Sequence, residues 1–342
     1  MKKVMIALSG GVDSSVAAHL LQETGFALCG GTLNLTGAST QDAAQAAERL
    51  SIPFYEFDEQ DAFREQVIRP FAESYERGET PNPCIICNRR IKFGILLERA
   101  LALGCDYVAT GHYAKVQKDA ATGRMLLYRA KDNKKDQTYM LYQLTQEQLA
   151  HALFPLGDYS KDEIRAIAAE IGLKNAQKPD SQDICFVPDG DYGTFLEAFQ
   201  GKVYPPGDFV DEEGKFLGQH QGIIRYTVGQ RKGLGIALGA PAFVLRKDAA
   251  QNQVVLGAED RLFTKRVAAC DVNWIAWEKP VDGTKVTAKT RYSQKEASAK
   301  IYATETGVMA EFEEPQRAPA PGQAMVFYDG DVVVGGGTII AD

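Results

Sequence analysis

Two groups of residues have types and spacings that could carry chemistry, and the first lies near the N-terminus. The run Ser9-Gly10-Gly11-Val12-Asp13-Ser14-Ser15 follows an apolar stretch and precedes a segment with helical periodicity. Backbone N–H groups at a helix start lack intrahelical partners, and the helix dipole favours negative charge there. Glycines let the backbone approach a phosphate closely. The run therefore predicts an anion site, with an unliganded tight turn as the alternative.

The kind of anion follows from what this loop lacks. No Lys follows the second glycine, so the loop is not a Walker P-loop. A loop without that Lys suits the β,γ-pyrophosphate of ATP as a leaving group, with attack at the α-phosphate. Asp13 is unexpected beside a phosphate unless it orients the loop or helps to hold Mg²⁺.

The second group consists of cysteines. Cys84 and Cys87 form a Cys-x-x-Cys, and Cys185 lies far along the chain. Asn82 can cap a helix with Pro83 at its first position, which places the first two cysteines about one turn apart. The helix N-terminus and neighbouring cations should favour thiolate; these cations are Arg89, Arg90 and Lys92. Packing cysteines, a zinc site or, with Cys185, a [4Fe–4S] cluster are alternatives.

The elements that must position these groups alternate along the first half of the chain. Residues 4–8, 26–35, 52–57 and 106–110 are apolar runs typical of buried strands, and residues 14–24, 43–50 and 91–103 have helical patterns. Alternating strands and helices indicate an α/β fold with a doubly wound parallel sheet.

The pattern changes after about residue 195. Gly and Pro become frequent, and residues 229–239 form a loop with four glycines. From about residue 267 short strand-like segments predict a small all-β barrel or sandwich. We therefore expect three domains: an α/β domain over 1–195, a small mixed central domain over 196–264 and a C-terminal β-barrel over 265–342.

Bulk properties exclude some classes of protein. The chain has 342 residues and a formal net charge of −7, which argues against binding a polyanion over its whole surface. Residues 265–300 nevertheless contain eight Lys or Arg against four Asp or Glu, an excess of four positive charges. No apolar run approaches the roughly 20 residues of a membrane span, so we expect no membrane partner and a cytoplasmic protein.

The phosphate loop resembles the signature of the N-type ATP pyrophosphatase (PP-loop) superfamily. Further blocks resemble the tRNA-specific 2-thiouridylases over essentially the whole chain. They lie at residues 80–93, 109–114, 133–139, 180–187, 218–222, 227–235, 289–292, 321–323 and 334–337. Many matching blocks in one order are more specific than any single motif.

The resemblance implies a mechanism. ATP would bind Ala7, Leu8, Ser9, Gly10, Gly11, Val12, Asp13 and Ser14, with Leu33 and Gly111 near the adenosine. The wobble uridine of tRNA would be flipped out of its stack, and its 2-oxygen would attack the α-phosphate. A cysteine desulfurase or sulfur-relay protein would load Cys185 as a persulfide. Cys87 would resolve the persulfide through a transient disulfide, or else release sulfide.

The resemblance also implies a set of tRNA contacts, for each of which a solvated surface role is the alternative. They are Asn82, Pro83, Cys84, His112, Lys135, Asp136, Gln137, Arg291, Tyr292 and Gln323. The common family form has Asp where Cys84 stands, and Thr-Gly where Gln182 and Asp183 stand. These departures favour the hypothesis of a subtype in which Cys84, Cys87 and Cys185 bind an iron–sulfur cluster.

Overall fold

A parallel five-stranded sheet forms the N-terminal part of the computed structural model, which describes residues 1–173 and 184–341. The strand order is β3-β2-β1-β4-β7, and all four pairings are parallel. The bounds are β1 Lys3–Ala7, β2 Ala27–Asn34, β3 Phe54–Asp58, β4 Tyr107–Ala109 and β7 Ala152–Leu153. The predicted doubly wound sheet is confirmed, and β7 is a further edge strand that the sequence pattern did not indicate.

Successive residues of β1 supply two separate cores because side chains alternate across a strand. Val4 and Ile6 pack on one face with α1 (Val12–Glu23), α2 (Gln41–Arg49) and α9 (Lys161–Glu170). Met5 packs on the other face with α6 (Leu96–Ala102). Both faces are therefore covered, as expected for a parallel sheet.

The helix that carries the Cys-x-x-Cys begins earlier than the pattern at 91–103 indicated. It starts with α5 (Pro83–Ile86), continues as a π-helical segment (Cys87–Ile95) and ends in α6. Asn82 caps it, because its Oδ1 accepts a hydrogen bond of 3.2 Å from the Cys84 backbone N–H. The cap predicted from the sequence is thus confirmed. A second helical stretch, not predicted, comprises α3 (Gln60–Phe63), a π-helical turn (Arg64–Ile68) and α4 (Arg69–Glu76).

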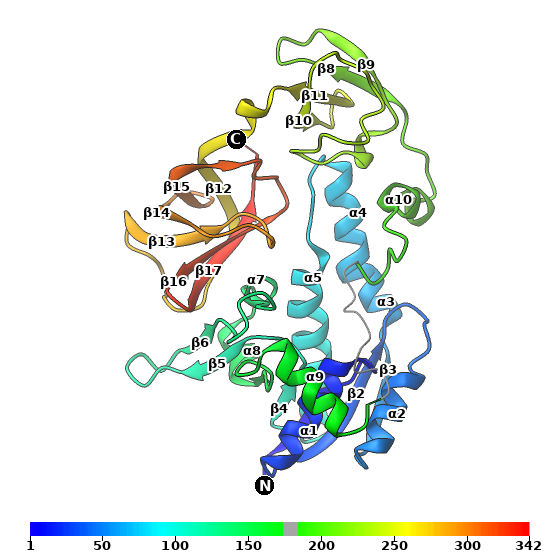
Figure 1. The fold of residues 1–342 in the computed structure, drawn as a ribbon, viewed down its shortest axis with the longest axis vertical. Helices are drawn as coiled ribbons and strands as arrows, with labels where there is room; N and C mark the ends of the chain where they lie inside the picture. Colours follow the sequence, from blue (N-terminus) through cyan, green and yellow to red (C-terminus); the bar gives the residue numbers. More distant parts are fainter. Residues whose placement is uncertain (174–183, 342) are drawn as a thin grey trace.

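A small four-stranded sheet lies at the far end of the molecule from the parallel sheet (Figure 1). Its order is β10-β11-β8-β9, with β8 Gly207–Val210, β9 Phe216–His220, β10 Phe243–Asp248 and β11 Gln253–Gly257. Its apolar residues share one core with α4, the Cys87 segment and α10 (Tyr192–Gln200). The small central unit therefore packs directly on the helices that lead to the cysteines.

The C-terminal strands close into a six-stranded antiparallel barrel, in the order β12-β15-β14-β13-β16-β17 with β12 also paired to β17. The bounds are β12 Phe263–Trp274, β13 Thr284–Lys289, β14 Ala297–Ala303, β15 Gly307–Arg317, β16 Ala324–Asp329 and β17 Val332–Ile339. Of the two predicted alternatives, the barrel is therefore the one that forms.

A hairpin from the N-terminal half extends this barrel. Strands β5 (Lys115–Lys118) and β6 (Met125–Tyr128) pair with each other, and β6 pairs with β17. Two short helices, α7 (Thr138–Leu141) and α8 (Gln146–Ala150), follow the hairpin. The barrel is thus joined to the N-terminal part by backbone hydrogen bonds. Within the described residues, no helix is both long and apolar enough to cross a bilayer.

Candidate active site

The phosphate loop lies where the sheet order reverses. β1 pairs with β2 on one side and β4 on the other, so the loops after β1 and β4 meet at the carboxyl edge, the usual ligand position in such sheets. Gly111 follows β4 and touches the start of α1. A Cβ on it would lie 2.9 Å from both the Asp13 carbonyl carbon and the Ser14 nitrogen. The predicted ATP residues from the two loops are therefore in contact.

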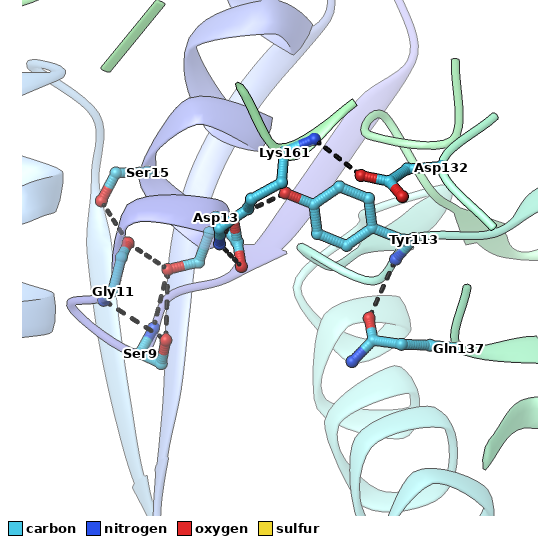
Figure 2. Close-up of polar contacts among 9 residues, drawn as sticks. Ser9, Gly11, Asp13, Ser15, Tyr113, Asp132, Gln137 and Lys161 are labelled. Atoms are coloured by element: carbon cyan, nitrogen blue, oxygen red, sulfur yellow. Dashed lines mark hydrogen bonds and ion pairs between the residues drawn. The ribbon is translucent and has the colours of Figure 1, made fainter. Parts of the chain in front are cut away.

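Hydroxyl groups hold the loop in shape (Figure 2). The Ser14 and Ser15 hydroxyls donate to the Gly11 carbonyl at 3.1 and 3.0 Å. The Ser9 and Ser14 hydroxyl oxygens are 3.2 Å apart, and the Ser9 N–H donates to Ser14 Oγ at 3.3 Å. Gly11 is the N-cap residue of α1 and supplies no side-chain cap. The first N–H groups of α1 are therefore the groups that an anion at this helix end would meet.

Asp13 is held by two side chains from elsewhere in the chain (Figure 2). The Lys161 ammonium donates to both of its carboxylate oxygens at 2.8 Å, and the Tyr113 hydroxyl donates to Oδ1 at 2.9 Å. Of the two roles considered for Asp13, these contacts support the orienting one. Sequence reasoning missed Lys161 and Tyr113 as site residues, because nothing local to either residue indicates a contact with Asp13.

A cavity of about 260 Å³ opens beside the loop. The cavity is lined by the phosphate loop with the start of α1, by α2 and by Leu173. The lining residues are Gly10, Gly11, Val12, Ser15, Asp42, Gln45, Ala46, Arg49 and Leu173. Gly10 has a φ of +73° and sits so close to α2 that a Cβ would lie 2.3 Å from that of Asp42. Ala7 ends β1 and Leu8 is buried just after it, while Leu33 is half-buried near the end of β2.

The three cysteines predicted to be catalytic come from two segments and interact electrostatically with one another. Cys87 is buried, whereas Cys84 and Cys185 are exposed. Residues 180–183, which precede Cys185 and include the departures at Gln182 and Asp183, lie outside the described residues.

The expectation that these thiols favour the thiolate is wrong for this structure. Burial raises the pKa of Cys87 to about 11, and the nearby Lys92 only partly offsets it. Loss of hydration is also the largest cause of the raised pKa of Cys84 and of Cys185, and Lys92 again acts in the opposite direction. Desolvation therefore outweighs the local cations, and the thiol is the resting form at neutral pH.

The described residues do not assemble a metal site. Within 1–173 and 184–341, no three His, Cys, Asp or Glu side chains are arranged so that they could hold a metal ion. Asp13, considered above for Mg²⁺, has both carboxylate oxygens engaged by Lys161. We therefore derive no chemical step through a protein-bound metal.

Several of the predicted tRNA contacts meet around the cap of the cysteine helix. The Asn82 amide donates to Met140 Sδ at 3.3 Å, and Pro83 is buried at the first position of α5. The Gln323 amide reaches from the barrel and donates to the Thr80 carbonyl at 2.6 Å. The Thr80 N–H in turn donates to the Pro321 carbonyl at 2.8 Å. The barrel thus forms two hydrogen bonds with Thr80, in the segment that leads to Cys84.

The remaining predicted contacts near this cap come from the segment before α7. Asp136 is buried and accepts from the Thr138 hydroxyl at 2.6 Å, and Gln137 Oε1 accepts from the Tyr113 N–H at 2.9 Å. The Tyr292 hydroxyl donates to the Asp136 carbonyl at 3.3 Å. Lys135 is half-buried beside them. Residues from the N-terminal part and from the barrel therefore lie in one region.

Two other predicted contacts are largely internal. His112 is buried, its Nδ1 is 2.7 Å from the Thr110 hydroxyl, and burial holds its pKa well below the usual value. It is therefore neutral at neutral pH. The Arg291 guanidinium donates to the Val228 and Ala318 carbonyls at 2.8 and 2.9 Å. In this structure Arg291 joins the barrel to the central unit.

The fold and the loop define a class of protein. A parallel sheet with Ser-Gly-Gly-Val-Asp-Ser-Ser after its first strand, at the switch point, characterises the PP-loop ATP pyrophosphatases. Three family models match in succession: a tRNA methyl transferase HUP domain over 2–189, a tRNA methyl transferase PRC-barrel domain over 193–258 and an aminomethyltransferase β-barrel domain over 264–339.

Curated relatives specify the family within that class. The tRNA-specific 2-thiouridylase MnmA of Acetivibrio thermocellus is 50% identical, with 99% of each chain covered. The protein of the same name from Lachnoclostridium phytofermentans is 49% identical, with 99% of this chain and all of that protein covered. That from Clostridioides difficile is 48% identical over 99% of this chain and 98% of that protein. The chain belongs to the tRNA-specific 2-thiouridylase family.

Proposed function

We propose that the protein replaces the 2-oxygen of the wobble uridine of tRNA with sulfur, in a reaction driven by ATP. The observation that carries the proposal is an intact phosphate loop together with three free cysteines, near enough to raise one another's pKa, in a chain that matches its relatives end to end. The loop supplies activation, and the cysteines supply sulfur.

The activation step uses the loop at the carboxyl edge of the sheet. The uridine 2-oxygen attacks the α-phosphorus of ATP, an O–P bond forms, and the bond to the β,γ-pyrophosphate breaks. The N–H groups at the start of α1 and the hydroxyls of Ser9 and Ser14 are placed to bind the pyrophosphate that leaves. Mg²⁺ would arrive bound to the ATP phosphates and neutralise part of their charge.

The sulfur step uses the difference in exposure between two cysteines. Cys185 is exposed, which suits loading as a persulfide by a cysteine desulfurase or a sulfur-relay protein. The terminal sulfur attacks C2 of the adenylated uridine, and AMP leaves with the oxygen. The buried Cys87 thiol then loses its proton and attacks Cys185 Sγ. The bond between Cys185 Sγ and the transferred sulfur breaks, and the electron pair of that bond stays on the transferred sulfur. A dithiol reductant must afterwards reduce the Cys87–Cys185 disulfide.

We also propose the division of labour expected from the sequence. Residues 1–195 bind ATP and carry the thiols, residues 265–342 contribute tRNA contacts, and residues 196–264 join them. The contacts of Gln323 with Thr80 and of Tyr292 with Asp136 support tRNA binding where barrel and catalytic part meet. The proposed location is the cytoplasm.

The test is mass analysis of tRNA nucleosides after reaction with ATP, Mg²⁺ and a sulfur donor. We expect 2-thiouridine with the native chain and none with Cys185→Ala. Cys270→Ala is the matched control, because Cys270 belongs to barrel strand β12 and is not one of the proposed site residues. A methylated nucleoside, as the names of two family models would suggest, or thiolation by Cys185→Ala, would refute the proposal. Pyrophosphate release without tRNA would indicate a small-molecule substrate.

An iron–sulfur variant of the same reaction is a second candidate. The cysteine at position 84 favours it, although the three thiols of the described structure are not arranged so that they could hold a metal ion. Anaerobic purification with iron analysis tests it: about four irons per chain and absorbance near roughly 400 nm would support a cluster. An iron-free chain that thiolates tRNA would exclude it.

A further inference from the structure

Lys161 is a buried cation beside the phosphate loop that the proposed mechanism has not used. Its ammonium lies 2.8 Å from each carboxylate oxygen of Asp13 (Figure 2). The Lys161 side chain is 8% exposed, whereas that of Asp13 is 31% exposed. Burying a charge is costly unless it is paired. The pair explains why Lys161 is tolerated there, but not why the pair stands at a loop that binds anions.

The position of this ammonium is set from several directions. Lys161 is the first residue of α9, behind a capping box formed by Ser160 and Glu163. Its backbone N–H donates to Asp132 Oδ2 at 3.1 Å. Helices α9 and α1 contribute to the same hydrophobic core. The ammonium is therefore carried by a helix that packs on the helix of the phosphate loop.

The balance of charge at the phosphate loop suggests a role for the Lys161–Asp13 pair. Asp13 lies in the first turn of α1, where a carboxylate is favoured by the helix dipole but repels a polyphosphate bound at the same helix end. The loop also lacks the Lys with which a Walker P-loop contacts the β- and γ-phosphates. An ammonium from another helix can meet both requirements.

We propose that Lys161 is the cation through which this PP-loop binds the β,γ-pyrophosphate of ATP, with Asp13, itself held by the Tyr113 hydroxyl, keeping the ammonium at the loop. The inference rests on the proposed ATP-dependent function and adds a binding residue to it. The ammonium neutralises the Asp13 carboxylate and also interacts with the phosphates. The leaving pyrophosphate gains negative charge as its bond to the α-phosphorus breaks, so the same contact stabilises the leaving group.

Calorimetric titration of the full chain with ATP, AMP and inorganic pyrophosphate, with Mg²⁺ and without tRNA, tests the assignment. We expect Lys161→Met to weaken ATP and pyrophosphate binding by about 10-fold or more, because losing one close charge contact costs at least that much. AMP lacks the pyrophosphate, so its affinity should stay within about twofold. Lys131→Met is the matched control, because Lys131 is an exposed lysine paired with Glu163 of the same helix. It should leave all three affinities unchanged.

Two results for Lys161→Met would overturn the inference: an unchanged ATP affinity, or equal losses of ATP and AMP affinity. Full recovery of ATP binding in the double variant Lys161→Met, Asp13→Asn would also overturn it, because Lys161 would then be only a counter-ion of Asp13. If circular dichroism shows that Lys161→Met is unfolded, Lys161→Arg replaces it. Its ratio of ATP to AMP affinity should then fall at least about threefold, and an unchanged ratio would overturn the inference. A native chain that binds no ATP would refute the proposed function instead.

Discussion

Replacing Gly111 by Ala should damage ATP binding through a purely steric effect. A Cβ at this position would lie 2.9 Å from the carbonyl carbon of Asp13 and from the nitrogen of Ser14, and 3.1 Å from the Cβ of Asp13. The first two are backbone atoms of helix α1, whose residues Val16 and Ala17 are fully buried. They cannot rotate away as a side chain could, so the loop after β4 and the start of α1 must separate by about 0.5 Å to restore ordinary contact.

The expected magnitude follows from this separation. Overpacking of a well-packed site costs about 1–3 kcal/mol of unfolding free energy. In a chain of this size that corresponds to a fall of about 1–4 °C in Tm. The N–H groups at the start of α1 move with the helix, and binding groups must be held within roughly 0.5 Å of their productive geometry. We therefore expect ATP affinity to fall about tenfold or more.

Calorimetric ATP titration and thermal unfolding of Gly111→Ala measure both effects. Gly123→Ala is the matched control: Gly123 lies in the β5–β6 turn with φ +73°, and a Cβ there would meet no atom within 4 Å. The control should lose about 1 kcal/mol from backbone strain and bind ATP normally. If Gly111→Ala binds ATP as tightly as the native chain, the assignment of the ATP site to the junction of these two loops is refuted.

Three further outcomes are expected. Lys92→Met should slow alkylation of Cys84 at about pH 8 by roughly two- to fivefold, because the Lys92 ammonium lowers the pKa of that thiol. Cys270, followed in the same peptide-mass experiment, should react at its native rate. Equal alkylation rates of Cys84 in the variant and the native chain would contradict this prediction. His112 has a lower pKa in the folded than in the unfolded chain. As the pH falls below about 6.5, the unfolded chain therefore binds a proton at His112 that the folded chain does not. The free energy of unfolding then falls by up to about 1.4 kcal/mol per pH unit. In urea unfolding His112→Gln should lack this component, and an unchanged pH slope would show that His112 is not the cause. Gln323→Leu removes the 2.6 Å hydrogen bond to Thr80, so it should reduce tRNA thiolation with little effect on ATP affinity, and a parallel loss of ATP binding would contradict a role confined to the barrel contact.

Local features were predictable because neighbouring residues determine them. The strand, turn and helix around Ser9–Ser15 follow from apolar runs, glycines and helical periodicity, and the structure has all three. The Asn82 cap followed from the preference of that side chain for a helix start. The barrel strands followed from short apolar segments separated by turns, although only the β12–β17 pairing decides between a barrel and a sandwich.

The sequence by itself therefore determined the order of the elements, the phosphate loop and the cysteines that we propose for sulfur transfer. Only the tertiary structure decided which distant groups act on them. It brings Lys161 to Asp13, adds the β5–β6 hairpin to the barrel and places Gln323 on the segment before Cys84. It also reverses the expected direction of the Cys87 pKa, because burial of the thiol outweighs the nearby cations. Desolvation and long-range charge pairing depend on the folded surroundings, which no local pattern records.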